Sequence, residues 1–264
     1  GDAELERVKR KPLNDMAALD YLHAGRLHHH GVTKDDNDTA VRMLDKAIDL
    51  DPDFAQAYAW KACVLGQRFA FGFSDAEGNV VLEQAFAALD KALALDANDV
   101  ECHRLLCEVH MLEGDLDQAA VQNEQALTLN PNDPRLVAQK GELLTWQGHP
   151  EDGAAWIEQA MRLDPYGAPR RVHLLGRAMY CQGRFEEAAE AYRKIAVPRQ
   201  GQRAEFAACL AQLDQTQEAH RVAAEVREKD PEFVISSYLD SLSFEDIASR
   251  DSLADGMRKA GLPE

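Results

Sequence analysis

The sequence has little of several residue types, and each shortage narrows what the protein can be. Aromatic residues make up only 7% of the 264 residues. No apolar run approaches the roughly 20 residues that a membrane-spanning helix needs. Basic residues are also scarce, because 29 Lys and Arg stand against 46 Asp and Glu, a net charge of −17. Such a chain repels phosphate backbones and anionic lipid, so we expect no binding to nucleic acid or to a membrane.

Cysteine is present but follows no paired spacing, since no CxxC motif occurs. The five positions are Cys63, Cys102, Cys107, Cys181 and Cys209. An odd number without paired spacing predicts reduced, mostly buried thiols in a cytoplasmic protein. No signal peptide is visible. The chain begins with Gly1 in place of Met, which favours a piece excised from a longer protein.

Motifs typical of catalysis are absent from the sequence. No Gly-rich phosphate loop follows a strand, and neither a nucleophile elbow nor an HExxH motif occurs. The adjacent histidines at 28–30 point about 100° apart on a helix and therefore do not form a metal pair. The many carboxylates decorate exposed faces. We therefore predict no catalytic residue, no cofactor and no metal site, and these residues are not expected to form an enzyme.

The sequence does contain a repeated pattern of small residues, glycines and prolines. The steps from Gly114 to Gly148 and from Pro131 to Pro165 are both 34 residues. A fixed step of this size is typical of stacked structural units. Each repeat reads as two helices, and the second has small, large and small residues at i, i+4 and i+7, which form one apolar stripe. A proline then ends the repeat because it cannot continue a helix.

The pattern divides most of the chain into six repeats. They are predicted at 15–52, 53–97, 98–131, 132–165, 166–199 and 200–231. Residues 1–14 are dense in charge and read as a linker before the first repeat. About eleven extra residues near 68–78 interrupt the second repeat, and insertions in repeat proteins usually form loops.

Residues 232–264 follow the last repeat and are predicted to form capping helices. The stretch "DSLADGMRKAGLPE" opens with Asp and Ser, which favour a helix start, and places Leu253, Met257 and Ala260 on one stripe. Gly261, followed by Leu and Pro, is typical of a helix stop. Because a stacked array needs a cap for solubility, we expect this helix to cover the exposed face of the last repeat.

The repeat itself resembles the tetratricopeptide repeat (TPR). The third repeat shows a small residue, a glycine seven positions later, an alanine and a final proline, at Cys107, Gly114, Ala126 and Pro131. The resemblance implies an all-α fold, a right-handed α-solenoid of about six TPR-like helix pairs with a C-terminal capping helix. It also implies that the first helices of the pairs line an inner wall that binds a protein or peptide.

Aligning the repeat on the chain places ten polar or aromatic residues on this inner wall. They are Glu101, Arg104, Glu108, Arg135, Glu142, Trp146, Arg170, His173, Arg177 and Tyr180. Trp, Tyr and Arg are frequent at binding interfaces, so a partner-binding groove is one interpretation, and a solvated face is the other. The Lys and Asn set with which some TPR proteins hold a C-terminal carboxylate is not matched. Mixed-charge recognition of a peptide or a neighbouring domain is predicted instead.

Three aromatic residues of the insertion, Phe69, Phe71 and Phe73, are not required by repeat packing. They either fold back on their own helix pair or offer a hydrophobic contact to a partner. A second copy of the chain, giving a homodimer, is one such partner.

Longer stretches resemble the C-terminal region of proteobacterial class III adenylate cyclases. The opening "KRKPLNDMAALDYLHAG", the stretch "LNPNDPRLVAQKGELLTWQG" and the terminal "RKAGLPE" carry the similarity. In that group a cyclase domain precedes the repeats. The resemblance implies a non-catalytic, regulatory region of a bacterial signal-transduction protein, whose partner is a protein, a peptide or the N-terminal catalytic domain of its own chain. The alternative is a stand-alone TPR scaffold or co-chaperone for assembly or secretion.

Overall fold

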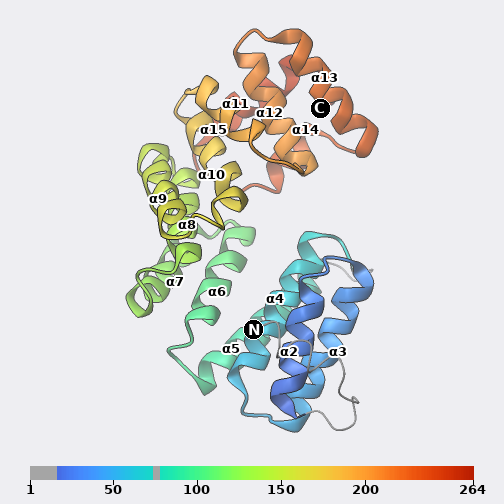
Figure 1. Ribbon diagram of the computed structural model, residues 1–264, viewed down its shortest axis with the longest axis vertical. Coiled ribbons are helices and arrows are strands. Elements are labelled where there is room, and N and C mark those ends of the chain that lie inside the picture. The colour runs from blue at the N-terminus through green and yellow to red at the C-terminus, as the bar shows by residue number, and fades with distance from the viewer. Residues whose placement is uncertain (1–16, 74–77) are drawn as a thin grey trace. The chain divides into compact units, whose positions relative to one another are not determined.

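The computed structural model describes residues 17–73 and 78–264, and it divides into two compact parts. The N-terminal part ends at Val109 and the C-terminal part begins at His110. All regular secondary structure in the described residues is helical, and successive helices are joined by short turns (Figure 1). The predicted all-α fold of consecutive helix pairs is therefore confirmed. No helix in these residues is both long and apolar enough to cross a lipid bilayer.

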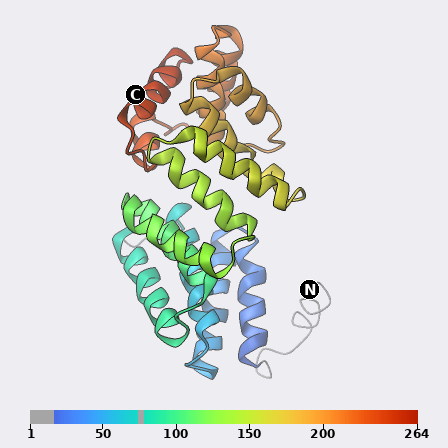
Figure 2. The ribbon, with the colours of Figure 1, turned by 90° about the vertical axis from the view of Figure 1, so that its left-hand side faces the viewer.

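The N-terminal part consists of neighbouring helices that run side by side (Figure 1 and Figure 2). They are α2 (Ala18–His29), α3 (Lys34–Leu50), α4 (Ala55–Ala70), α5 (Gly78–Leu95) and, across the division, α6 (Val100–Glu113). The second helix of the first pair buries Ala40, Leu44 and Ala47 completely, at the predicted spacing of four and three residues. Each buried leucine of this kind contributes about 1.5–3 kcal/mol to stability.

The insertion near 68–78 is only partly a loop. Residues 68–70 continue α4, and residue 78 already belongs to α5. Arg68 holds the extended end of α4 in place, because it donates to Asn37 Oδ1 at 2.9 Å and forms an ion pair with Asp38. The predicted loop is thus shorter than expected, and its residues 74–77 lie outside the described residues, as does the linker predicted at 1–14.

The C-terminal part continues the pairs and ends in two further helices. They are α7 (Leu116–Leu129), α8 (Pro134–Trp146), α9 (Pro150–Leu163), α10 (Ala168–Cys181), α11 (Phe185–Arg193), α12 (Gln200–Gln212), α13 (Thr216–Lys229), α14 (Ile235–Asp240) and α15 (Ile247–Lys259). Each of the six predicted repeat ranges encloses two of the helices found in the structure.

The glycines that mark the repeat in the sequence occupy the turns inside the pairs. Gly114, Gly148 and Gly183 have φ angles of 78°, 83° and 73°, in the left-handed region that glycine enters at no steric cost. In the last pair Asp214 takes this place with φ of 58°. The pattern therefore reflects one turn geometry that recurs between the first and second helices of the last four pairs.

The C-terminal cap differs from its prediction in two respects. Its helix, α15, begins at Ile247 with Asp246 as the N-cap, earlier than the predicted start at Asp251. It packs mainly against α12, and also contacts α10 and α14, so it lies against the first helices of two pairs. The predicted apolar stripe is present, because Leu253, Met257 and Ala260 are all buried.

Candidate functional site

Three of the predicted wall residues form an ion-pair group on α6. The guanidinium of Arg104 lies 2.7 Å from Glu101 Oε1 and 3.0 Å from Glu108 Oε2. The carboxylates are one turn before and one turn after Arg104, a spacing at which helix side chains meet. The side chain of Glu108 is 55% exposed, so the group offers a carboxylate to solvent while Arg104 stays half-buried.

Residues of α2 and α4 extend this group across two more first helices. The Arg26 guanidinium lies 4.6 Å from the ring centroid of Trp60, and the His29 ring meets the same indole edge-on at 5.8 Å. His29 Nε2 is also 3.6 Å from Cys63 Sγ. We call Arg26, His29, Trp60, Cys63, Glu101, Arg104 and Glu108 the N-terminal polar face.

Burial sets the protonation of two groups in the N-terminal polar face. Burial raises the pKa of the Cys63 thiol to about 12, so it stays protonated near neutral pH. Burial, followed by the neighbouring His30, lowers the pKa of His29, so its ring is neutral at the same pH. The face therefore presents a cation, a carboxylate and an indole around uncharged groups.

Sequence reasoning missed four residues of this face, His29, Trp60, Arg26 and Cys63, although a signal exists for Arg26 and Cys63. Each follows directly after the small residue of its first helix, Gly25 and Ala62, as Glu108 follows Cys107. This position after the small residue faces the inner wall in the repeat. Extending the alignment back to the first two repeats would have identified both.

In the C-terminal part, three of the predicted wall residues are buried. Trp146, Arg177 and Tyr180 were expected to line an open wall, but they are only 3%, 8% and 3% exposed. The end of the chain covers them. The Phe244 ring meets the Trp146 indole edge-on at 4.5 Å, and Tyr180 Oη donates to the Ser252 carbonyl at 2.9 Å.

Arg177 belongs to a buried polar network. Its guanidinium lies 2.7 Å from Glu205 Oε1, and Glu205 also accepts hydrogen bonds from the hydroxyls of Tyr192 at 2.7 Å and Tyr238 at 2.9 Å. Glu205 is 1% exposed. Removing Arg177 would leave this carboxylate buried without its cation, which is costly. Arg177 therefore stabilises the core, in contrast to the solvent-facing role expected from the sequence.

Residues 241–246, which we call the strap, connect α14 to α15 and reach the ends of two other helices. The Ser243 hydroxyl donates to the Met111 carbonyl in the last turn of α6. The backbone N–H groups of Glu245 and Asp246 donate to the carbonyl of Trp146, the last residue of α8, at 3.0 and 3.4 Å. The strap thus supplies hydrogen bonds to the carbonyl that ends α8, which has no later helical N–H to accept from, and a further bond to the Met111 carbonyl, which also accepts from the Gly114 N–H at 3.1 Å.

The other predicted wall residues of this part do not gather into one site. Glu142 lies 3.6 Å from Arg177, and His173 is half-buried on α10. Arg135 is exposed and forms a two-pronged contact with Asp133, at 2.7 and 3.2 Å. Arg170 lies in α10, and its side chain is outside the described residues. Partner binding by these residues stays a prediction.

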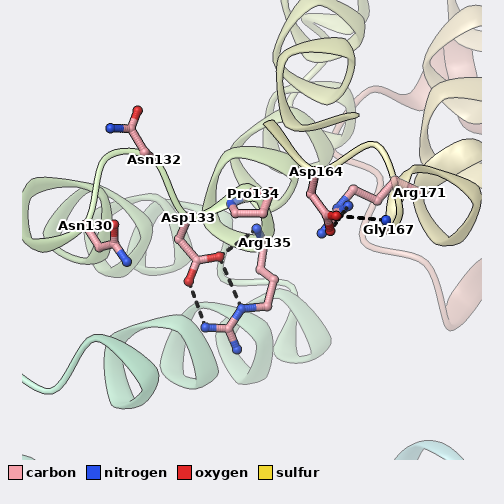
Figure 3. Close-up of a pocket in the computed structure, with 8 residues that line it drawn as sticks. All are labelled: Asn130, Asn132, Asp133, Pro134, Arg135, Asp164, Gly167 and Arg171. Carbon is pink, nitrogen blue, oxygen red and sulfur yellow. Dashed lines mark hydrogen bonds and ion pairs between the residues drawn. The ribbon is translucent and has the colours of Figure 1, made fainter. Parts of the chain in front are cut away.

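An open hollow of about 610 Å³ lies at the turns that precede α8 and α10 (Figure 3). Its two cations are already matched, because Arg135 pairs with Asp133 and Arg171 Nη1 lies 3.1 Å from Asp164 Oδ2. Both carboxylates also accept from backbone N–H groups of their own turns. The charged groups of the hollow therefore hold the turns, and we assign no ligand to it.

The aromatic residues of the insertion divide between core and surface. Phe69 is half-buried and packs against the core of α4 and α5. Phe71 and Phe73 stack on each other with ring centroids 5.5 Å apart, and Phe71 remains exposed. Packing therefore explains Phe69, and a partner contact through Phe71 and Phe73 stays a prediction.

Metal binding finds no support in the part of the chain that the structure describes. No group of three or more His, Cys, Asp or Glu side chains there is arranged to hold a metal ion. His28 Nδ1 and Asp36 Oδ1 lie 3.0 Å apart, and these two residues form a single pair between α2 and α3.

One protein family and several solved structures are similar to this chain. Residues 82–136 match the family model of the tetratricopeptide repeat. No curated protein matches the sequence. Among solved structures, TTC0263, a thermophilic TPR protein of Thermus thermophilus, is 21% identical with a TM-score of 0.58, over 74% of this chain and 99% of that one.

Two further structures are similar over more of the chain. The APC/C hetero-tetramer Cut9–Hcn1 matches with 17% identity and a TM-score of 0.71, over 96% of this chain and 45% of that one. Pseudomonas aeruginosa pilF matches with 16% identity and a TM-score of 0.57, over 88% and 94%. Identities this low concern the fold alone. The chain has the fold of tetratricopeptide repeat proteins and carries the repeat's sequence pattern over residues 82–136.

Proposed function

We propose that this chain is a protein-interaction region that holds a peptide or a neighbouring domain on the N-terminal polar face. The observation that supports this most directly is the continuity of the face. Arg26, Trp60 and Arg104 lie on three successive first helices, and His29 with Cys63 fills the space between them. Faces of this kind bind extended or helical segments in repeat proteins.

The chemistry of the face favours a partner segment with both signs of charge. Arg26 has no carboxylate partner among the described residues, and it rests on an indole that keeps it in position. Glu108, on α6, has an exposed carboxylate that suits a basic side chain. Charge pairs of this sort fix the register of a partner and its rate of association more than they raise affinity.

A charge reversal tests the assignment. The change is Arg26→Glu together with Glu108→Arg, and the control is Arg42→Glu, on the exposed surface of the second helix α3. Each variant is used as bait in native cytosol, and each recovered partner is quantified. We expect the double variant to recover a partner about tenfold less, which corresponds to about 1.4 kcal/mol. Equal recovery with both variants and the unchanged chain would exclude the face.

The larger context remains part of the proposal. The sequence resemblance supports a regulatory region of a class III adenylate cyclase, acting in the cytoplasm on its own catalytic domain, with a stand-alone scaffold or co-chaperone as the alternative. The gene sequence upstream of the codon for Gly1 separates them. A cyclase-type domain there supports the first, and an immediate start codon supports the second.

A further inference from the structure

Independently of the N-terminal polar face, we propose that the strap is an internal ligand. It occupies a polypeptide-binding site formed by Trp146 and the ends of α6 and α8. A partner polypeptide takes the same site in place of the strap, and it does so by presenting an aromatic side chain to Trp146 where Phe244 now lies.

The hydrogen bonds of the strap are those of a bound peptide. Its serine hydroxyl and two consecutive N–H groups donate to the carbonyls of Met111 and Trp146. The Trp146 carbonyl ends α8 and has no later N–H of that helix to accept from, so it can accept from another chain laid across it, whereas the Met111 carbonyl also accepts from the Gly114 N–H. Because two of these bonds come from the backbone, another polypeptide can make them without sharing the strap's sequence.

The aromatic contact is preorganised by the rest of the protein. Phe244 meets one side of the Trp146 indole, while the Arg177 guanidinium lies 4.6 Å from the same ring centroid. Arg177 is fixed in turn by its buried pair with Glu205. The indole therefore keeps its position when Phe244 leaves, and a held, uncovered tryptophan is the kind of group on which binding energy concentrates.

Residues 242–245 of the strap can leave while its flanking helices stay, because Asp246 remains in place as the N-cap of α15. Ile235 and Leu239 anchor α14 in the core, and Leu253 and Met257 anchor α15. The two flanking helices are joined by the ion pair of Asp240, at the end of α14, with Arg250, in the first turn of α15, at 2.6 Å. By contrast, no strap residue is fully buried, and Leu242 and Phe244 pack against the same core only at its edge, as partly buried side chains. The strap is therefore a short loop with fixed ends whose tip rests in the site.

A tethered segment of this kind competes with free ligands through its high local concentration. Short tethers give effective concentrations on the order of millimolar. A free polypeptide with the same contacts therefore binds weakly until the strap is loosened, and a partner with more contacts displaces it. Without a partner the strap occupies the site, and a competing polypeptide displaces it.

The test supplies the strap as a separate peptide. The probe is a synthetic peptide with the sequence of residues 240–247, "DSLSFEDI". It is titrated into the full chain, unchanged or carrying Ser243→Gly with Phe244→Gly, while the Trp146 indole N–H signal is followed by NMR. We expect a saturable shift in the double variant, with a dissociation constant at least about tenfold below that of the unchanged chain.

A peptide in which Phe is replaced by Ala is the matched control, and it should bind neither protein. If the double variant loses helical circular dichroism, Phe244→Ala replaces it in the same titration. Equal dissociation constants for variant and unchanged chain would overturn the proposal, and so would a folded variant that shows no saturable shift. Arg26→Glu with Glu108→Arg should leave this binding intact, which keeps the result separate from the test of the N-terminal polar face.

Discussion

At the residue scale, two glycines show why the repeat demands small residues at fixed positions. Gly141 on α8 faces Gly153 on α9, where the two helices of the pair cross. A Cβ atom added at Gly141 would lie 2.6 Å from the Gly153 carbonyl oxygen and 2.6 Å from Ile157 Cγ1. Contacts this short with backbone cannot be relieved by turning a side chain, so the helices would have to separate.

We therefore expect Gly141→Ala to lower the free energy of unfolding by about 1–3 kcal/mol, since it overpacks the crossing. Gly66→Ala is the matched control, because it makes the same change within the first helix α4 with no atom within 4 Å. It should raise stability by up to about 1 kcal/mol through helix propensity. Urea unfolding followed by circular dichroism measures both. A Gly141→Ala variant as stable as the parent would mean that the predicted register is wrong.

The burial of Arg177 could not be predicted from the residues around it in the sequence. The repeat alignment assigns Arg177 to the inner wall, and nothing near it in the sequence indicates otherwise. Its partner Glu205 is 28 residues away on α12. The sequence shows that Glu205 stands at a position where the repeat buries its side chains. It does not show that Arg177 is the partner, because that pairing depends on how α10 packs against α12.

At the element scale, the start of α15 depends on one capping residue. Asp246 accepts hydrogen bonds from the N–H groups of Ala248 at 3.2 Å and Ser249 at 3.1 Å. Hydrogen bonding from Ser249 holds the pKa of Asp246 below its ordinary value. The prediction of a start at Asp251 was wrong because Asp246 followed by Ile-Ala-Ser makes an equally good cap and adds a turn to the helix.

Asp246→Ala should therefore cost about 1 kcal/mol at neutral pH. Because the folded-state pKa is lowered, the stabilisation is complete above the ordinary value near 4 and is lost as the pH falls through the folded-state pKa. The stability difference between parent and variant should thus narrow from pH 5 to pH 3, as measured by urea unfolding. Asp251→Ala, an exposed position inside the helix, is the control. A difference that is constant with pH would contradict the cap.

At the scale of the whole molecule, the two parts use the same repeat in different ways. The N-terminal part keeps a polar face on its first helices, with Glu108 exposed. The C-terminal part covers its first helices with α15 and the strap. The surface of the first helices is thus exposed in the N-terminal part, whereas in the C-terminal part the end of the chain covers it.

The cysteines are distributed over both parts, so their reactivity reports whether each part stays folded. All five are thiols outside any disulfide, three in the N-terminal part and two in the C-terminal part. Burial raises the pKa of Cys63 to about 12 and of Cys181 to about 11, and the pKa of the fully buried Cys102 and Cys209 also rises. Thiolates of these four cysteines are therefore scarce in the folded protein at pH 8.

We expect all five thiols to react with a disulfide reagent at least about 100-fold more slowly in the native protein than in urea. Reaction of a chromogenic disulfide, followed by absorbance and by mass spectrometry of the labelled sites, gives the rate for each cysteine. One thiol that reacts at the rate of a free peptide would show that its surroundings open in solution.

The sequence by itself determined the local structure of this protein. Spacing of small and large apolar residues set the helix pairs, and glycines set the turns, because both depend on contacts within a few tens of residues. Only the tertiary structure decided which first-helix surface stays exposed. That outcome depends on where the last residues of the chain pack, and Phe244 reaches Trp146 across 98 positions of sequence that carry no periodic signal for the contact.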